Sequence, residues 1–375
     1  MLYRKMNKTD RKLSILGFGC MRLPQTADFA IDEQKATAML RYAIDRGVNY
    51  IDTAYVYHNG ESEPFLARAL ADGYREKVNL ATKLPVWDVR SRKDMDRILD
   101  EQLTRLNTDH IDFYLLHGLS RSSWGDMANL NVGEFLDNAI ADGRIRYAGF
   151  SFHDNVQVFK EIVDAYPWTF AQIQYNYMDE EYQAGTGGLD YAVEKGLGIV
   201  IMEPLRGGLL ARETAETKKI WALRGQSRTA AEWGLRWLWN RSEITVVLSG
   251  MSTMQQVKDN LKYANAGKPS SLTDGDLAVY EEVKTFYRGR VKIPCTKCRY
   301  CQPCMVGVKI PECFSAYNDA FIYQDTAGAK FSYDVFTGSD GDASQCQDCG
   351  VCESLCPQQI PIRKHLKEVV SLFGH

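Results

Sequence analysis

Residues 79–117 read NLATKLPVWDVRSRKDMDRILDEQLTRLNTDHIDFYLLH and predict one complete strand–helix–strand unit. The two ends of this stretch, Asn79–Lys83 and Ile111–His117, are short and largely apolar. Such runs are typical of parallel strands that are covered on both faces of the sheet. Between them, Asp94–Leu106 has the apolar spacing of an amphipathic helix.

The same alternation continues on both sides of this unit, from about Leu13 to Gly250. Further helical patterns cover Glu33–Arg46 and Thr229–Trp239. Six more apolar runs are expected strands: Ser14–Gly19, Tyr50–Ala54, Tyr147–Ser151, Ala171–Tyr175, Gly198–Glu203 and Ile244–Gly250. Eight strand–helix units in about 250 residues predict an α/β fold of the (β/α)₈ barrel type. An open, doubly wound sheet is the alternative, but no Gly-x-Gly-x-x-Gly follows the first strand.

The two ends of the barrel segment carry additional elements. Met1–Lys12, with a turn near Asn7–Asp10, is expected to form a hairpin that closes the bottom of the barrel. Thr273–Tyr287 predicts one more helix after the eighth unit. Composition then changes abruptly at Val291, so we expect a barrel domain over residues 1–290 and a second domain over 291–375.

Composition and charge exclude several classes of protein. A hydrophobic fraction of 45% and a charged fraction of 25% are ordinary for a soluble globular protein. A net charge of −3 argues against a nucleic-acid partner. No apolar run approaches the length of a membrane span, and Met1–Asp10 lacks the apolar core of a secretory signal. We therefore expect a cytoplasmic protein.

Eight of the ten cysteines fall in two tight runs near the C-terminus. The first is Cys295-x2-Cys298-x2-Cys301-x2-Cys304, and the second is Cys346-x2-Cys349-x2-Cys352-x3-Cys356, followed by Pro357. In two-cluster ferredoxins, three cysteines of a run bind one [4Fe–4S] cluster and the fourth binds the other cluster. The pattern predicts a small ferredoxin-like domain with two [4Fe–4S] clusters.

The same logic assigns the ligands. One cluster would take Cys295, Cys298, Cys301 and Cys356, and the other Cys346, Cys349, Cys352 and Cys304. Structural zinc is the alternative, because paired Cys-x2-Cys also occurs in zinc ribbons, but zinc does not explain triple runs. Cys313 is an alternative to Cys304 as the outlying ligand.

Four ionisable residues lie at or just after the carboxyl ends of three successive strands, where barrel enzymes carry their chemistry. They are Asp52, Tyr57, Lys83 and His117. A lysine close to a tyrosine hydroxyl lowers the pKa of the phenol, and an aspartate keeps that lysine charged and in place. The tyrosine can then give a proton to a carbonyl oxygen while hydride reaches the carbon. The histidine can orient or polarise the same oxygen.

Residues 13 to about 265 resemble the aldo–keto reductase superfamily. The resemblance rests on motifs in the family's order: Leu16-Gly17-Phe18-Gly19, Asp52-Thr53-Ala54-x-x-Tyr57 with Ser62-Glu63, Thr82-Lys83, Asp112-x-x-x-Leu116-His117, Gly149-Phe150-Ser151, Gln172-x-x-Tyr175-Asn176 and Pro204-Leu205-x-Gly207-Gly208. It implies a barrel, a nicotinamide cofactor, and a tetrad of Asp52, Tyr57, Lys83 and His117 with Tyr57 as the acid.

The resemblance also implies which residues hold the cofactor. Ser151 and Gln172 would hold the carboxamide, and the loop from Leu205 to Gly208 would lie against the pyrophosphate, where glycines allow close backbone approach. The stretch from Ser249 to Asn260 matches the family's loop for the adenosine phosphate. The full set of expected contacts is Ser151, Gln172, Met202, Pro204, Leu205, Gly207, Gly208, Ser249, Gly250, Ser252 and Asn260.

Three departures from the family pattern bear on the cofactor. Phe152 stands where the family usually has Asn, and Met202 where an aromatic ring often stacks on the nicotinamide. Gln255 and Gln256 occupy the region where NADPH-specific members carry Arg, although Lys258 could supply a cation. NADP(H) is the expected cofactor, with NAD(H) as the alternative.

The barrel and the cysteine runs together resemble the aldo–keto reductases that have a C-terminal [4Fe–4S] domain. The expected function is reduction of a small-molecule carbonyl with NAD(P)H. Two alternatives use the barrel as a docking platform instead: an electron-transfer protein served by ferredoxin or another redox partner, and a redox-sensing, nucleotide-binding subunit. The four converging polar residues of the barrel favour the enzyme.

Overall fold

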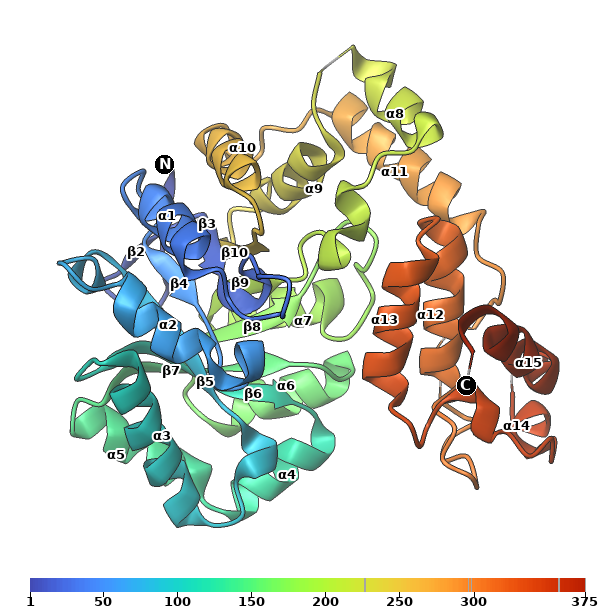
Figure 1. The fold of residues 1–375 in the computed structure, drawn as a ribbon, viewed down its shortest axis with the longest axis horizontal. Helices are drawn as coiled ribbons and strands as arrows, with labels where there is room; N and C mark the ends of the chain where they lie inside the picture. The colour runs from blue at the N-terminus through green and yellow to red at the C-terminus, as the bar shows by residue number, and fades with distance from the viewer. Residues whose placement is uncertain (226, 296, 298, 357, 375) are drawn as a thin grey trace. The chain divides into compact units, whose positions relative to one another are not determined.

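The computed structural model describes residues 1–225, 227–295, 297, 299–356 and 358–374, apart from the side chain of residue 224. The chain forms two compact units (Figure 1). The first contains Met1–Ala211 and Arg228–Asp274, and the second contains Arg212–Ser227 and Gly275–His375. In the part of the chain that the structure describes, no helix is both long and apolar enough to cross a membrane.

The first unit is a closed barrel of eight parallel strands in the order β10-β3-β4-β5-β6-β7-β8-β9. Each strand pairs with the next strand of the sequence, as a repeated strand–helix unit requires. The strands are β3 (Leu16–Gly19), β4 (Tyr50–Asp52), β5 (Asn79–Leu84), β6 (Ile111–Leu119), β7 (Ile145–Phe152), β8 (Phe170–Gln174), β9 (Gly198–Met202) and β10 (Ile244–Gly250). The predicted (β/α)₈ barrel and all eight strand positions are confirmed.

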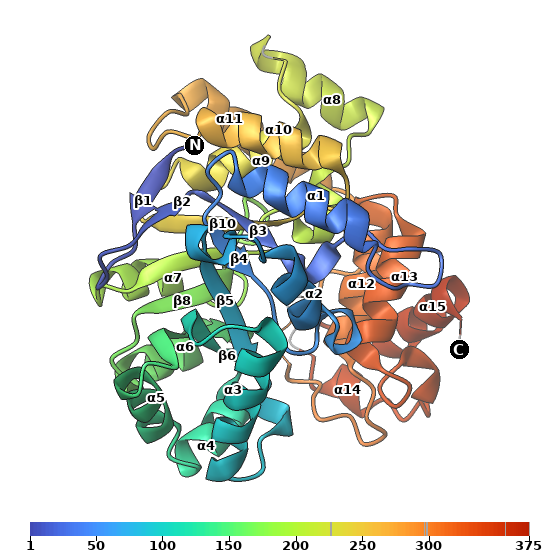
Figure 2. The ribbon, with the colours of Figure 1, turned by 60° about the vertical axis from the view of Figure 1, so that its left-hand side comes forward.

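Helices cover the outside of this barrel (Figure 2). They are α1 (Glu33–Ile44), α2 (Ser62–Ala69), α3 (Arg92–Leu106), α4 (Arg121–Asn129), α5 (Val132–Ala141), α6 (Val156–Ala165), α7 (Gly185–Glu194), α9 (Ala230–Trp239) and α10 (Met254–Asn265). Helix α3 begins with a capping box of Ser91 and Asp94 and ends at Asn107, which has left-handed backbone angles. These caps account for its bounds.

Short 3-10 helices make many of the remaining turns. They are η1 (Cys20–Arg22), η2 (Tyr57–Gly60), η3 (Arg75–Lys77), η4 (Val86–Asp88), η5 (Arg206–Ala211), η6 (Ala222–Arg224) and η7 (Ala343–Gln345). Four of them, η1, η2, η4 and η5, follow the carboxyl ends of barrel strands. They therefore shape the end of the barrel where the expected catalytic residues lie.

An antiparallel hairpin of β1 (Tyr3–Lys5) and β2 (Lys12–Ser14) closes the amino end of the barrel. Met6 and Leu13 are fully buried in the same inner core as Phe170. A β-carbon on Gly198 would come 1.8 Å from the sulfur of Met6, so the start of β9 has no room for a side chain. The predicted hairpin at the bottom of the barrel is confirmed.

The second unit is helical, and its described residues contain no strand. Its helices are α8 (Ala215–Trp221), α11 (Asp274–Arg288), α12 (Ile310–Ile322), α13 (Thr326–Thr337), α14 (Val351–Ser354) and α15 (Ile362–Phe373). Buried side chains of α12, α13 and α15, among them Phe314, Tyr333 and Phe373, form its core. A ferredoxin-like fold is therefore not displayed by the described residues of this unit.

The boundary expected at residue 291 falls inside the second unit, which takes up α11 and the segment Arg212–Ser227. Aromatic pairs explain this grouping. The rings of Trp221 and Tyr280 lie 5.5 Å apart, and those of Tyr287 and Tyr323 lie 5.2 Å apart. These contacts join α8 to α11 and α11 to the end of α12.

Candidate active site

Lys83 and Asp52 form a buried ion pair at the carboxyl ends of β5 and β4. Lys83 Nζ lies 2.7 Å from Asp52 Oδ1 and donates a second hydrogen bond to the carbonyl of Thr53 at 2.6 Å. Burial alone would lower the pKa of Lys83, but the charge of Asp52 and the phenol of Tyr57 raise it above its usual value. The ammonium group therefore stays charged inside the protein.

Tyr57 begins η2, and its ring centre lies 5.1 Å from Lys83 Nζ. Burial raises the pKa of Tyr57, while the charge of Lys83 and a hydrogen bond from it act to lower that pKa; the net direction is upward. The sequence pattern predicted that Lys83 lowers the pKa of Tyr57. It did not include the larger, opposite effect of burial. The neighbouring His58 Nε2 donates to the carbonyl of Cys20 at 3.0 Å, which ties the segment of Tyr57 to the end of β3.

His117 extends from β6 toward the same site. Its ring lies 6.1 Å from that of Tyr57 in an edge-to-face arrangement, and 5.0 Å from that of Trp87 in η4. Burial, with a smaller contribution from Lys83, lowers the pKa of His117 well below its usual value. Its Nδ1 is buried without a hydrogen-bond partner among the described residues. A neutral imidazole with an unpartnered ring nitrogen is suited to contact a substrate oxygen.

A buried polar network behind Lys83 was not identified from the sequence. Glu63 Oε1 accepts hydrogen bonds from Thr82 Oγ1 at 2.6 Å and from Gln102 Nε2 at 2.9 Å. Gln102 Nε2 also donates to the carbonyl of Lys83 at 3.0 Å, and Gln102 Oε1 accepts from Tyr114 at 2.8 Å. Gln102 lies on α3, where its position on the buried face looks like that of any core residue.

Ser151 and Gln172, the expected carboxamide ligands, lie buried near the carboxyl end of β7 and in the middle of β8. Ser151 Oγ accepts a hydrogen bond from the backbone N–H of Gly118 at 2.8 Å. Gln172 Nε2 lies 3.6 Å from the sulfur of Met202, and Gln172 Oε1 has no partner among the described residues. An unpartnered buried acceptor fits the amide N–H group of a nicotinamide.

The loop after β9 exposes its main chain at two glycines. Pro204 is buried, and a β-carbon on Gly234 would collide with Leu205 at 2.5 Å, so this segment packs tightly against α9. Gly207 and Gly208 are exposed and have φ of 65° and 98°, a region that favours glycine. Apart from Gly208 and its two chain neighbours, no atom of the described residues lies within 4 Å of the position of a β-carbon on Gly208. The surface fits a phosphate group that must approach the main chain closely.

The segment from Ser249 to Asn260 joins β10 to α10. Asn260 Nδ2 donates to Ser249 Oγ at 3.0 Å, inside the protein, and Ser252 Oγ donates to the carbonyl of Arg22 at 2.8 Å. Gln256 Oε1 accepts from the backbone N–H groups of Ser252 and Thr253 at 2.8 and 3.2 Å. Gln256 therefore caps the helix. Its neighbour Gln255 is paired with the carboxylate of Asp259 at 3.0 Å.

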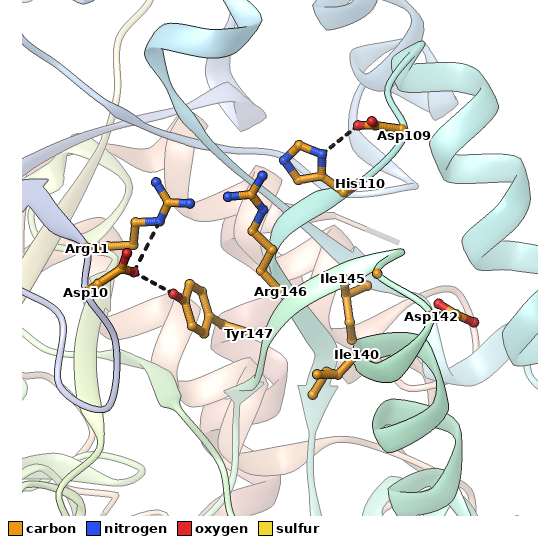
Figure 3. A pocket seen from close by; sticks show the side chains of 10 residues that line it. Asp10, Arg11, Asp109, His110, Ile140, Asp142, Ile145, Arg146 and Tyr147 are labelled. Carbon is orange, nitrogen blue, oxygen red and sulfur yellow. Dashed lines mark hydrogen bonds and ion pairs between the residues drawn. The ribbon is translucent and has the colours of Figure 1, made fainter.

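A separate hollow of about 560 Å³ lies at the opposite, amino end of the barrel (Figure 3). It is lined by Asp10, Arg11, Asp109, His110, Ile140, Asp142, Gly143, Ile145, Arg146 and Tyr147. Its acidic side chains have partners within the protein: Asp10 accepts a hydrogen bond from Tyr147, Asp109 contacts His110, and Asp142 forms an ion pair with Arg144. Paired charges at this end of a barrel indicate a stabilising network rather than a catalytic site.

Cysteines of both runs meet in the second unit. Cys295 and Cys301 from the first run line one cavity together with Cys356 from the second run. This is the combination that the crossed ligand assignment expects for one cluster. Cys298 and Pro357 lie outside the described residues. Cys304 packs against the same apolar core as these cysteines.

The cysteines of the second run affect one another's ionisation. Burial, the carboxylate of Glu353 and the neighbouring thiols of Cys346 and Cys349 raise the pKa of Cys352 to about 11. Thiols that oppose one another's ionisation in this way are suited to a shared metal group, whose positive charge favours the thiolate form. In the described ranges, which leave out Cys298, no three ligand side chains are close enough to hold a metal ion as they stand.

Cys313 lies apart from this arrangement. It is fully buried in α12, with its sulfur 3.9 Å from the carbonyl of Gly341, and burial raises its pKa to about 12. These surroundings are those of a structural cysteine.

Comparison with known proteins agrees with the geometry of the barrel. The family model described as "Aldo/keto reductase family" matches residues 15–273. The uncharacterized oxidoreductase YqkF of Bacillus subtilis is 27% identical over 71% of this chain and 92% of its own length. Probable aldo-keto reductase 1 of Glycine max is 28% identical over 54% of this chain and 59% of its own length.

A solved structure is similar over the same part. It is the holo form of aldo-keto reductase AKR11C1 from Bacillus halodurans, which is 28% identical, with a TM-score of 0.63. The match covers 75% of this chain and 96% of that one.

Proposed function

The chain belongs to the aldo/keto reductase family, and from that premise we propose that it reduces a small-molecule carbonyl with NAD(P)H and carries two [4Fe–4S] clusters in its second unit. The observation that supports the reductase activity most strongly is the ion pair of Lys83 and Asp52 beside Tyr57 and His117. These four residues come from the carboxyl ends of β4, β5 and β6 and from the turn after β4. This end of the barrel is where such enzymes act.

In this proposal the substrate oxygen lies between Tyr57 and His117. When bound, the nicotinamide supplies the hydride that reaches the carbonyl carbon. Tyr57 gives its hydroxyl proton to the oxygen, and the nearby Lys83 charge stabilises the phenolate left behind. His117, kept neutral by burial, donates a hydrogen bond to the same oxygen and orients it.

Ser151 and Gln172 are proposed to hold the carboxamide, since Gln172 Oε1 is a buried acceptor without a partner among the described residues. We propose NADP(H) as the usual cofactor, because it is typical of the family. Gln256 supplies no cation for a 2′-phosphate, and its acceptor already caps α10. We therefore expect a modest preference for NADPH and measurable use of NADH.

For the clusters, we propose Cys295, Cys298, Cys301 and Cys356 as ligands of one, and Cys346, Cys349, Cys352 and Cys304 as ligands of the other. The cavity shared by Cys295, Cys301 and Cys356 supports the first set. The electrostatic influence of Cys346 and Cys349 on the thiol of Cys352 supports the second. The clusters would sit on a helical scaffold.

Anaerobically purified protein tests both halves of the proposal. We expect about eight iron atoms and eight acid-labile sulfides per chain, and oxidation of NADPH that depends on a member of a panel of aldehydes and ketones. If no carbonyl is reduced while ferredoxin reduces the clusters, the reductase proposal is wrong and the electron-transfer alternative takes its place.

Replacement of single cysteines tests the ligand sets. Cys356→Ser is expected to lower the iron content and to alter the spectrum of the cluster bound by the first run, because Cys356 completes that set. Cys313→Ser, at a buried thiol outside both sets, is the matched control and is expected to keep the full iron content. Iron loss in Cys313→Ser with none in Cys356→Ser would contradict the assignment.

A further inference from the structure

Arg22 is the last residue of η1 and reaches across two loops at the carboxyl end of the barrel. Its stem lies over the end of β10, because a β-carbon on Gly250 would come 3.2 Å from Cβ, Cγ and Cδ of Arg22. Its guanidinium reaches the loop after β9, because a β-carbon on Gly207 would come 3.1 Å from Arg22 Nη2. The side chain therefore connects the Gly207–Gly208 loop to the Ser249–Ser252 segment.

The backbone of Arg22 is held in this place. Its carbonyl accepts the hydrogen bond from Ser252 Oγ at 2.8 Å. The adjacent carbonyl of Cys20 accepts from His58 Nε2 at 3.0 Å. Two loops thus fix η1, so the long side chain starts from an ordered position.

Arg22 is exposed, and no carboxylate within the described ranges forms an ion pair with it. The carboxylate of Glu203 also lies near this loop: its Oε2 is 3.8 Å from the position of a β-carbon on Gly207. Among the described residues, Glu203 and Arg22 form no ion pair. The charge of Arg22 is therefore available to an anion at the exposed backbone of Gly207 and Gly208.

We infer that Arg22 binds the pyrophosphate of the dinucleotide, an inference that rests on the proposed function. A guanidinium presents a planar fork of donors that matches phosphate oxygens. Glycines at 207 and 208 leave no side chain between that fork and the ligand. Arg22 would then supply a cation on one side of the pyrophosphate, opposite the main chain of the loop.

The alternative target on the same ligand is the 2′-phosphate of NADPH. The position of the guanidinium at Gly207 favours the pyrophosphate, since the loop expected for the adenosine phosphate begins at Ser249 and leads into α10. The two targets give different predictions. The pyrophosphate is common to NADH and NADPH, whereas the 2′-phosphate is present in NADPH alone.

The test is the affinity of the whole anaerobic protein for NADPH, NADH and ADP, measured by quenching of tryptophan fluorescence and by calorimetry. Arg22→Ala is expected to raise the Kd of NADPH and of NADH by the same factor, about 10- to 100-fold, and to weaken ADP as well. Arg22→Lys keeps the charge without the fork, so a smaller rise is expected.

Arg46→Ala is the matched control, because Arg46 stacks on Tyr42 near the C-terminal end of α1 and the loss of charge is the same. Its Kd values are expected to equal those of the wild type. Weakening of NADPH alone, or of neither dinucleotide, would overturn the inference for Arg22. If the wild-type protein binds neither dinucleotide, it is the proposed function that fails, and this is seen before any substitution.

Discussion

At the scale of single residues, the chemistry depends on a charge that is kept inside the protein. Lys83 is buried together with Asp52, and each is the other's counter-charge. Removing one partner of such a pair leaves an uncompensated charge, which costs about 3–5 kcal/mol. Burial also raises the pKa of Asp52, which Lys83 opposes.

Lys83→Met is expected to lower kcat for carbonyl reduction by about 10²- to 10⁴-fold. Without the ammonium, nothing opposes the effect of burial on the pKa of Tyr57, and the phenolate loses its stabilising charge. The measurement is kcat at saturating NADPH. Lys77→Met, at an exposed lysine near the ring of Tyr74, is the control and should retain wild-type activity. A Lys83→Met enzyme with normal kcat would remove Lys83 from the mechanism.

Tyr57→Phe should abolish carbonyl reduction, since the ring is kept and only the proton donor is lost. Iron content and the absorbance of the clusters should stay unchanged, because Tyr57 belongs to the first unit and the cysteines to the second. Activity at the wild-type level would show that another group donates the proton.

The pH dependence of reduction follows from two shifted groups. The lowered pKa of His117 means that the imidazole stays neutral as the pH falls through about 6.5, its usual pKa. The raised pKa of Tyr57 means that the phenol stays protonated as the pH rises toward about 10. We expect kcat to be flat between these limits and to fall only above the upper one. A step in kcat near pH 6.5 would contradict the assignment of His117.

At the scale of elements, β5 is held in register by side chains from two helices. Glu63 from α2 and Gln102 from α3 meet behind the strand, and Gln102 bonds the carbonyl of Lys83 itself. A full set of partners inside a low-dielectric region is what makes such a network favourable, and a missing partner makes it costly. The position of Lys83 thus depends partly on α3.

Gln102→Ala is expected to lower the free energy of unfolding by about 2–4 kcal/mol, because Glu63 loses a donor and Tyr114 loses its acceptor inside the protein. Urea denaturation of the anaerobic protein measures this change. Gln34→Ala, at an exposed position of α1, is the control and should stay within about 0.5 kcal/mol. Equal stability of the two variants would refute a structural role for the network.

The elements themselves could be predicted from sequence, because each barrel strand is a short apolar run and each cover helix has a periodic apolar face. The hairpin of β1 and β2 was predicted from its turn. The role of Gln102 could not be predicted, since a buried glutamine on a helix gives no indication of which strand it contacts. Nor could the placement of Arg22, which depends on two loops that lie more than 180 residues further along the chain.

At the scale of the whole molecule, the chain leaves the first unit twice. It passes into the second unit at Arg212, returns at Arg228, and leaves again at Gly275. Arg212 forms an ion pair with Asp325 at 2.8 Å within the second unit. Composition marked the boundary at residue 291, where the cysteines begin. Composition could not predict that α8 and α11 belong to the second unit, because only tertiary contacts assign them there.

If the clusters are bound as proposed, removing iron with a chelator under argon should unfold the second unit before the barrel. Six of the described cysteines pack against its apolar core, so this core would lose its cross-links while the inner core of the barrel is unaffected. Urea unfolding of the chelated protein, followed by circular dichroism, should show two steps. A single coincident transition before and after chelation would contradict this prediction.

The helix η5 that carries Gly207 and Gly208 ends at Ala211, one residue before the second unit begins at Arg212. The proposed coenzyme loop and the unit proposed to bind iron are therefore joined directly along the chain. Linkage requires that, if bound coenzyme strengthens iron binding by some factor, bound iron strengthens coenzyme binding by the same factor. If the two sites are coupled, saturating NADPH is accordingly expected to raise the chelator concentration that removes half of the iron at equilibrium, and equal midpoints with and without NADPH would show that they are not coupled.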